Sequence, residues 1–226
     1  MQNFASYFLD IIFPQTCILC GKISENNICN ICKKRLKKYE KQVLFSNSLK
    51  IEKFLHCGKV YFEKFFYLYE YKGLIRKIIL DYKFNSKSYF CNFFVKMLLN
   101  CKKTYRLFSF YDIIIPVPME KKKELKRGYN QAKLITDFLC DNIVLINGND
   151  AVIKIKNTKT QSTLNLIDRK ENIKNAFIVN NIKKVKNKKI IIFDDICTTG
   201  STANELSRVL KEAGAKEILV IVLAKD

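Results

Sequence analysis

The chain has 226 residues, of which 48% are apolar and 27% are charged, and its formal net charge is +20. The apolar share is enough to build a buried core, which excludes an intrinsically disordered chain. No apolar run approaches the roughly 20 residues that cross a bilayer, which excludes a membrane-spanning helix. We therefore expect a cytoplasmic protein of one or two domains without membrane insertion.

The positive charge is large for a chain of this size and predicts attraction to polyanions such as DNA, RNA or phosphorylated metabolites. Three basic runs, Lys33–Lys41, Lys121–Arg127 and Lys183–Lys189, lie far apart in the sequence. A polyanion-binding face accounts for this charge, and so does a general compositional bias toward lysine.

The first 14 residues, MQNFASYFLDIIFP, contain no basic residue ahead of their apolar stretch, and Asp10 interrupts that stretch. A secretory signal peptide requires a basic start and an unbroken apolar run. The pattern instead predicts a short amphipathic helix.

The cysteine spacing that follows is typical of a metal site. Cys17-x-x-Cys20 and Cys29-x-x-Cys32 are two knuckles separated by eight residues. Each knuckle lets two thiolates reach one tetrahedral Zn²⁺, and Gly21 allows the first turn its conformation. Ligation by four cysteines leaves no open coordination position, so the predicted zinc is structural. The alternative is four ordinary buried thiols, since a disulfide framework is not expected in the cytoplasm.

Residues 1–58 hold the cysteine cluster and a basic stretch, and we predict that residues 59–226 form a second domain. Val60–Tyr71 predicts one or two strands crowded with Phe and Tyr, and the helices Leu74–Tyr82 and Ser88–Leu99 follow. The aromatic side chains could stack on nucleic-acid bases. We interpret them as core residues, because large rings most often serve to bury apolar surface.

The C-terminal half alternates apolar strands with amphipathic helices. The predicted strands are Tyr111–Val117, Lys189–Phe193 and Ile218–Ala224, and the predicted helices are Gln131–Cys140 and Ser201–Ala213. The first helix carries an apolar stripe, made of Ala132, Ile135, Phe138 and Leu139. Buried strands separated by helices predict an α/β fold with a parallel sheet that is covered on both faces.

The most informative segment is the turn after the second of these strands. The strand ends in Asp194 and Asp195, and a helix begins at Ser201. Unpaired N–H groups at a helix N-terminus favour a phosphate. The turn adds hydroxyl donors and a glycine that allows close approach, namely Thr198, Thr199, Gly200, Ser201 and Thr202. Two adjacent carboxylates suit a pair of sugar hydroxyls or a Mg²⁺-bound sugar. The alternative is an ordinary turn with capping residues; the Lys of an ATPase phosphate loop is absent.

This segment resembles the motif with which type I phosphoribosyltransferases bind 5-phosphoribosyl-1-pyrophosphate (PRPP). The shared pattern is an apolar strand, two acids and Thr-Thr-Gly-x-Thr. The resemblance implies that Asp194 and Asp195 hold the ribose 2′- and 3′-hydroxyls. It also implies that residues 198–202 hold the 5′-phosphate.

Four further motifs narrow the resemblance. They are Pro116-Val117-Pro118, Arg127-Gly128-Tyr129-Asn130-Gln131, Gln161-Ser162-Thr163-Leu164 and Arg169-Lys170-Glu171-Asn172. In this order, and behind a cysteine cluster, they resemble the ComF family over nearly the whole chain. The resemblance implies a type I phosphoribosyltransferase-like domain with an N-terminal zinc finger and a part in DNA uptake during natural competence. Many such proteins carry further paired cysteines, whereas this chain has only Cys57 beside His56, so a second zinc site is in doubt.

The resemblance also implies a pyrophosphate site and a mobile hood loop. Type I enzymes bind pyrophosphate with the loop after the first core strand, which corresponds here to Pro118, Met119 and the residues up to Arg127, whose guanidinium suits a phosphate. Residues 154–177 fall where the hood closes over the sugar and excludes water. Its polar candidates are Lys156, Lys159, Gln161 and Arg169. The alternatives are a surface loop before a capping Asn130, and a structural hairpin with solvated charges.

Two functions follow from these patterns. The first is a phosphoribosyltransferase-like protein in which a nucleophile displaces pyrophosphate from PRPP while Mg²⁺ neutralises the leaving group. No general base can be named, because the single histidine, His56, belongs to the zinc-finger region. The second is a non-enzymatic module that binds single-stranded DNA or a competence helicase through its zinc finger and basic residues, with the PRPP site as a sensor or a relic.

Overall fold

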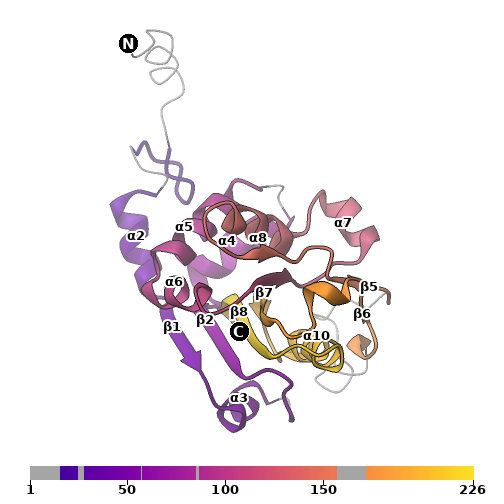
Figure 1. Ribbon diagram of the computed structural model, residues 1–226. Coiled ribbons are helices and arrows are strands. Elements are labelled where there is room, and N and C mark those ends of the chain that lie inside the picture. The colour runs from indigo at the N-terminus through magenta and orange to yellow at the C-terminus, as the bar shows by residue number, and fades with distance from the viewer. Residues whose placement is uncertain (1–15, 25–27, 57, 85–86, 157–171) are drawn as a thin grey trace.

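A six-stranded sheet forms the centre of the computed structural model, which describes residues 16–24, 28–56, 58–84, 87–156 and 172–226 (Figure 1). In spatial order its strands are β1 (Glu40–Phe45), β2 (Lys64–Glu70), β8 (Glu217–Lys225), β7 (Lys189–Cys197), β3 (Ile113–Pro116) and β4 (Ile146–Asn147). β1 is antiparallel to β2, and every other neighbouring pair is parallel. The predicted α/β fold with a parallel sheet is confirmed, and the antiparallel edge strand β1 is an addition that was not predicted.

Helices cover both faces of this sheet (Figure 1). The helical elements that the structure describes in full are α2 (Asn30–Lys37), α3 (Ser48–Leu55), α4 (Gly73–Phe84), α5 (Phe90–Asn100), α6 (Lys102–Phe108), α7 (Lys121–Arg127), α8 (Gln131–Cys140), α10 (Ser201–Glu212) and the 3₁₀ turn η2 (Ile182–Lys184). α7 and η2 bury none of their residues. A separate antiparallel ribbon consists of β5 (Val152–Lys154) and β6 (Phe177–Val179). Within the described ranges, no helix has the length and apolar character that a membrane crossing requires.

The side chains of the central strands alternate between two hydrophobic clusters. On β7, Ile191 and Phe193 join the cluster that contains the apolar faces of α4, α5 and α8. Ile190 and Ile192 join the other cluster, with α3 and α10. This alternation follows from the two-residue period of a strand, and each buried side chain of this size contributes about 1.5–3 kcal/mol relative to an exposed one. Packing on both faces of the sheet therefore fixes the position of β7, whose carboxyl-terminal end carries Asp194 and Asp195.

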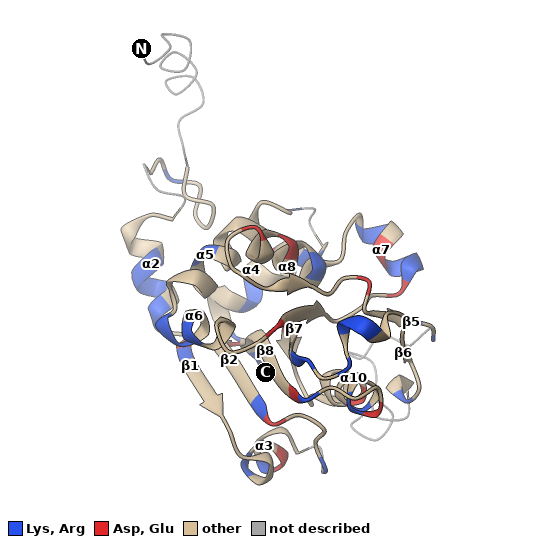
Figure 2. Cartoon of the chain, viewed as in Figure 1, with Lys and Arg blue, Asp and Glu red and all other residues tan. Residues whose placement is uncertain are grey.

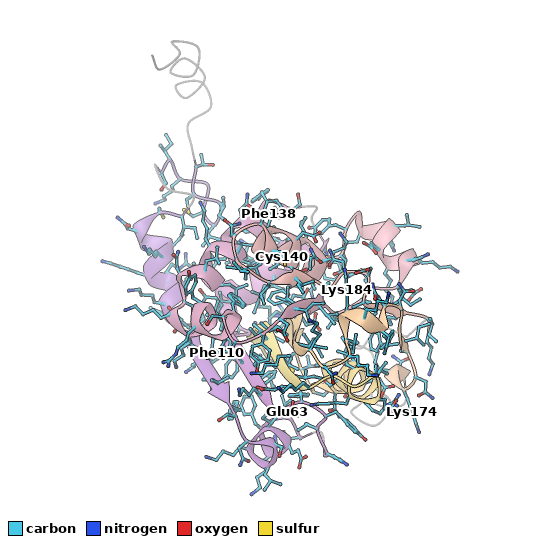
Figure 3. All side chains as sticks on the ribbon, viewed as in Figure 1. Glu63, Phe110, Phe138, Cys140, Lys174 and Lys184 are labelled. Carbon is cyan, nitrogen blue, oxygen red and sulfur yellow. The ribbon has the colours of Figure 1, made fainter. Side chains whose placement is uncertain are left out.

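Three predictions about these elements need correction. β7 runs four residues beyond Phe193, because it stays paired with β8 as far as Cys197 opposite Lys225. The acid pair thus lies within the strand and not after it. Phe138 does not belong to the buried stripe of α8: its side chain is 38% exposed on the outer side of the helix (Figure 3), whereas Ile135 and Leu139 are buried. The third correction is α7, a short helix where a loop was expected.

Two predictions lie wholly or partly outside the described residues. The N-terminal amphipathic helix over residues 1–14 is one of them. The hood segment 154–177 is the other, because the description stops at residue 156 and resumes at residue 172. The described flanks of this segment form the β5–β6 ribbon, with Val152 opposite Val179 and Lys154 opposite Phe177. The domain boundary at residue 58 stays a prediction.

Candidate functional site

The turn between β7 and α10 is tightly packed against α3. Gly200 has a φ of +73° at the N-terminus of α10, and a Cβ there would lie 2.8 Å from Leu55 Cδ1. Glycine is therefore required both for the backbone conformation and for the space. The hydroxyls of Thr199 and Ser201 lie 2.8 Å apart and are buried, and the Ser201 N–H points to the Thr199 hydroxyl at 3.4 Å. These two hydroxyls shape the turn whose backbone forms the predicted phosphate site.

The acid pair precedes this turn and faces a lysine from α4. Lys83 Nζ lies 2.8 Å from Asp195 Oδ1, and the backbone N–H of Asp195 donates to Asp194 Oδ1 at 2.8 Å. Burial, reinforced by the negative charge of Asp195, raises the pKa of Asp194 to about 7, although the charge of Lys83 opposes the shift. Two adjacent carboxylates with one nearby cation form a strong hydrogen-bond acceptor whose charge state changes near neutral pH.

A cavity of about 600 Å³ opens above the acid pair. It brings together six of the residues predicted for the site, which are Asp194, Asp195, Thr202, Pro118, Met119 and Arg127. The other predicted turn residues, Thr198 to Ser201, do not line it, and the predicted pyrophosphate contact Arg169 lies outside the described residues. The loop after β3, α7 and the end of β7 are far apart in the sequence and line the same cavity.

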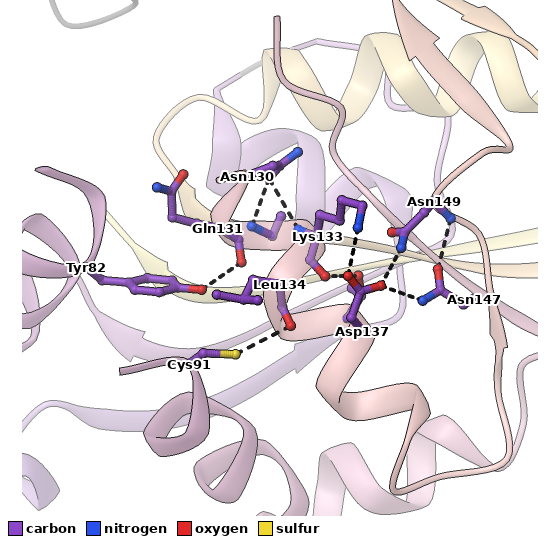
Figure 4. Close-up of polar contacts among 11 residues, drawn as sticks. Tyr82, Cys91, Asn130, Gln131, Lys133, Leu134, Asp137, Asn147 and Asn149 are labelled. Atoms are coloured by element: carbon purple, nitrogen blue, oxygen red, sulfur yellow. Dashed lines mark hydrogen bonds and ion pairs between the residues drawn. The ribbon is translucent and has the colours of Figure 1, made fainter. Parts of the chain in front are cut away.

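The wall opposite the turn is built by α8 and the loop after β3. The Asn130 side chain caps α8 by accepting hydrogen bonds from the N–H groups of Ala132 at 3.0 Å and Lys133 at 3.3 Å (Figure 4). Its own amide donates to the carbonyl of Val117 at 3.1 Å, which closes the loop against the helix. The predicted cap is confirmed, and it fixes the loop that contains Pro118 and Met119.

Arg127 is held on the same wall. Its Nη1 donates to Gln131 Oε1 at 2.5 Å, and its guanidinium lies 5.0 Å from the ring centre of Phe84. Phe84 and Gln131 also line the cavity. The guanidinium is thus oriented by an amide and an aromatic face, a geometry that suits planar recognition of a phosphate.

A polar network ties this wall to the sheet (Figure 4). On α8, Asp137 accepts hydrogen bonds from Lys133 Nζ at 2.9 Å, from Asn147 Nδ2 at 2.7 Å and from the Asn149 amide. Burial alone would raise the pKa of Asp137, but these donors hold it below its usual value. The carboxylate stays ionised and joins α8 to β4, so it stabilises the position of the helix that carries Gln131.

Several cavity residues were not predicted from the sequence. Besides Gln131 and Phe84 they are Lys83, Glu120, Lys123, Lys126 and Lys154. Burial, aided by the charge of Lys123, lowers the pKa of Lys154 to about 8. The basic run Lys121–Arg127 was visible in the sequence, but only as a charged stretch. Figure 2 places α7 and α2 on opposite sides of the molecule, so the charges of these two helices do not form one continuous face.

The four knuckle cysteines form a compact cluster on the other side of α4 and α5. Their sulfur atoms all lie within 4.8 Å of one another, and the Sγ atoms of Cys20 and Cys29 are 3.8 Å apart. Four thiolates at the usual Zn–S distance of about 2.3 Å are separated by about 3.8 Å along each edge of a tetrahedron. The geometry therefore fits one structural Zn²⁺. In the first knuckle, the N–H of Gly21 donates to the carbonyl of Cys17 at 2.8 Å, and Gly21 has a φ of +73°.

The thiols of this cluster differ in acidity. Burial alone would raise the pKa of Cys17, but the backbone N–H groups of Cys29, Leu19 and Cys20 lower it to about 6. Burial and the neighbouring thiols raise the pKa of Cys32 to about 12. A cation that binds all four sulfurs must displace protons from them, so its affinity falls with falling pH.

Comparison with known proteins places both sites in one family. Residues 143–226 match the phosphoribosyl transferase domain and residues 8–43 match the double zinc ribbon domain. Competence protein F of Haemophilus influenzae is 31% identical, in an alignment that covers 94% of this chain and 98% of that protein. The chain belongs to the ComF family. The family resemblance predicted from the motifs is confirmed.

Two further ComF relatives carry related names. DNA utilization protein YhgH of Escherichia coli strain K12 is 27% identical, with 94% of this chain and 97% of that protein covered. Competence protein ComFC of Bacillus subtilis is 26% identical over 151 residues, or 65% of this chain and 58% of that protein. The phosphoribosyl transferase match contains the turn and the acid pair, whereas Lys83 and the loop from Pro118 to Arg127 lie outside it. The zinc ribbon match contains the cysteine cluster and supports a structural zinc.

Proposed function

We propose that the cavity binds PRPP, with Asp194 and Asp195 accepting hydrogen bonds from the ribose hydroxyls and the β7–α10 turn holding the 5′-phosphate. One observation carries the proposal. The acid pair shares a cavity with five cationic side chains from three separate segments, namely Lys83, Lys123, Lys126, Arg127 and Lys154. A ligand with a vicinal diol and several phosphates offers donors to the acids and negative charge to the cations. The family match supports a phosphoribosyl ligand in particular.

If the chain is catalytic, the reaction is displacement at C1 of the ribose. A nucleophile forms a bond to C1 as the bond from C1 to the pyrophosphate oxygen breaks, and pyrophosphate leaves with that electron pair. Bound Mg²⁺ would supply charge neutralisation on the leaving group. Pro118, Met119 and Arg127 line the cavity and are proposed to contact the pyrophosphate, as is Arg169, which lies outside the described residues.

Calorimetry tests the binding proposal directly. PRPP with Mg²⁺ should bind one site per chain, and ATP with Mg²⁺, which lacks a 1-pyrophosphate on its ribose, should bind at least tenfold more weakly. A thermal-shift titration provides a second measurement, because a ligand at 100 times its Kd stabilises the folded state by about 2.7 kcal/mol. Equal affinity for both ligands, or none for PRPP, would contradict the proposal. Release of labelled pyrophosphate with a set of amine acceptors then tests catalysis.

A second candidate function is binding of single-stranded DNA at α2. This helix begins inside the second zinc knuckle and is coloured largely by basic residues in Figure 2. Its exposed basic side chains are Lys33, Lys34, Arg35 and Lys37, and the exposed Lys38 follows at its C-terminal end. A metal-bound turn would fix such a helix rigidly against a phosphate backbone. The names of the ComF relatives, which refer to competence and DNA utilization, support this candidate, and the helicase partner stays a prediction. The two functions use different parts of the chain and are compatible.

A further inference from the structure

The C-terminal end of α4 is anchored at the cavity from two directions. Ile75, Ile78 and Ile79 bury one face of the helix in the core. At its end, the Tyr82 hydroxyl donates to the carbonyl of Gln131 at 3.0 Å, and the Tyr129 hydroxyl donates to the carbonyl of Tyr82. The next residue, Lys83, therefore starts from a fixed backbone position. α4 lies outside the segment that matches the phosphoribosyl transferase domain.

Among the ion pairs of the described residues, Lys83–Asp195 is the most buried. Its two side chains are 18% and 9% exposed, so water screens the pair weakly and the attraction is stronger than between exposed charges. Asp195 has a like-charged neighbour, Asp194, whose Oδ1 accepts the N–H of Asp195. The other charged side chains around the cavity are Glu120, Lys123, Lys126, Arg127 and Lys154. Lys83 forms a direct ion pair with Asp195, and Lys154 also interacts electrostatically with Asp194.

We propose that Lys83 is a positioning residue for the acid pair, holding the Asp195 carboxylate in the orientation in which the pair accepts hydrogen bonds from a vicinal diol. This inference rests on the proposed function, because it assigns the cation that the diol site requires. The ammonium neutralises one of the two adjacent charges, so both carboxylates stay available as acceptors. If Lys83 instead competed with the diol for Asp195, removing its charge would strengthen diol binding. A positioning role predicts that removing the charge weakens diol binding.

The test compares Lys83→Met, which keeps the apolar stem and removes the charge, with Lys83→Arg, which keeps the charge. Affinities for PRPP, ribose 5-phosphate and inorganic pyrophosphate, each with Mg²⁺, are measured by calorimetry. Lys83→Met should weaken PRPP and ribose 5-phosphate at least tenfold, because both carry the diol. It should change pyrophosphate, which has no diol, less than threefold. Lys83→Arg should keep all three affinities within about threefold of the wild type.

Lys87→Met is the matched control. Lys87 follows α4, and its Nζ lies 3.0 Å from Asp81 Oδ2 of that helix; neither residue lines the cavity, so no affinity should change. If Lys83→Met does not fold, Lys83→Gln replaces it, and the same difference between diol-containing and diol-free ligands decides. Equal losses for all three ligands, unchanged affinities, or tighter diol binding would each overturn the positioning role. A wild-type protein that binds none of the ligands would instead overturn the proposed function.

Discussion

The zinc region and the central sheet are stabilised by different kinds of interaction. In β8, seven consecutive residues are buried, from Ile218 to Ala224. Around the cysteine cluster, by contrast, the apolar side chains of Ile23 and Ile31 are exposed, and burial is concentrated at Cys17 and Cys32. Burial of apolar surface holds the sheet, whereas bonds to one cation would hold the knuckles.

Because of this difference, a single substitution should affect the stability of the two regions differently. Structural zinc sites contribute about 10–16 kcal/mol of folding free energy through a few bonds. A buried apolar side chain contributes about 1.5–3 kcal/mol, and many of them act together. Losing one ligand should therefore unfold the knuckles, while losing one apolar side chain leaves the sheet folded. The predictions below separate the two regions, beginning with the largest expected effect.

Removing one zinc ligand should give the largest difference between the two regions, because the knuckles should unfold while the sheet stays folded. The wild-type chain is expected to contain one zinc, and Cys32→Ser should release it, because three thiolates hold the cation much less tightly than four. Metal analysis and hydrogen exchange should show loss of zinc and of protection in α2, with protection in β7 and β8 retained. Cys140→Ser, which lies outside the cluster, serves as the control. Zinc retained at one per chain in the Cys32 variant would contradict the assignment, and so would an unprotected sheet.

Neutralising the acid pair should do the reverse, removing ligand binding while leaving the metal in place. Asp194→Asn combined with Asp195→Asn removes two charge-assisted hydrogen bonds, each worth about 1.5–3 kcal/mol. PRPP affinity should fall by more than tenfold in calorimetry, with one zinc per chain and an unchanged circular dichroism spectrum. Asp141→Asn, at an exposed position after α8, is the control. A folded double variant with wild-type PRPP affinity would remove the diol assignment.

The stability of the folded chain should also depend on pH through Asp194, near the end of β7. The pKa of Asp194 is raised to about 7 in the folded chain, whereas an unfolded Asp titrates near 3.9. The folded state therefore binds more protons between about pH 4 and pH 7, so this group makes the chain less stable as pH rises through that window. Asp194→Asn should remove that loss and raise the Tm at pH 8, by about 2–4 °C per kcal/mol recovered.

The zinc region complicates this measurement, because its thiols also titrate. Comparing wild type with Asp194→Asn at each pH cancels the contribution of the knuckles, which both proteins share. The difference in Tm should be small at pH 4 and grow toward pH 8. A Tm difference between the two proteins that does not change with pH would show that burial does not raise the pKa of Asp194. For ligand binding the sign is opposite, since only the ionised acid accepts from both hydroxyls, so PRPP affinity should rise through pH 7.

The smallest expected effect concerns the charge of α2. If this helix binds single-stranded DNA, four or more phosphate contacts give a slope steeper than about −2.5 in log affinity against log salt. Replacing Lys33, Lys34 and Lys37 by Gln should flatten the slope by about 2, at about 0.7 for each contact. The same change at Lys183, Lys186 and Lys188 is the control, and PRPP affinity should stay unchanged in both variants. A shallow wild-type slope would favour compositional bias as the origin of the charge.

The sequence predicted the parts of the site that are contiguous along the chain. The acids, the turn and the start of α10 follow one another, so their chemistry was visible as a motif, and the Asn130 cap was visible for the same reason. Lys83 was not, because its contact with Asp195 depends on how α4 packs beside β7. α7 escaped prediction because none of its residues is buried, so it has no apolar period to detect. Phe138 shows the opposite error, since its spacing fits a stripe wider than the surface that α8 buries.

The length of α4 limits how ComF sequences can vary while Lys83 still reaches Asp195. The helix has 12 residues and spans about 18 Å at 1.5 Å per residue, with a buried face before the residue that reaches Asp195. Inserting one residue before Lys83 would turn the end of the helix by about 100°, since a turn takes 3.6 residues. The ammonium would then leave the acid pair while every residue type stayed the same. A relative whose α4 differs in length by a single residue must bring its cation to the acids from another element, which makes helix length as informative as residue identity when ComF sequences are aligned.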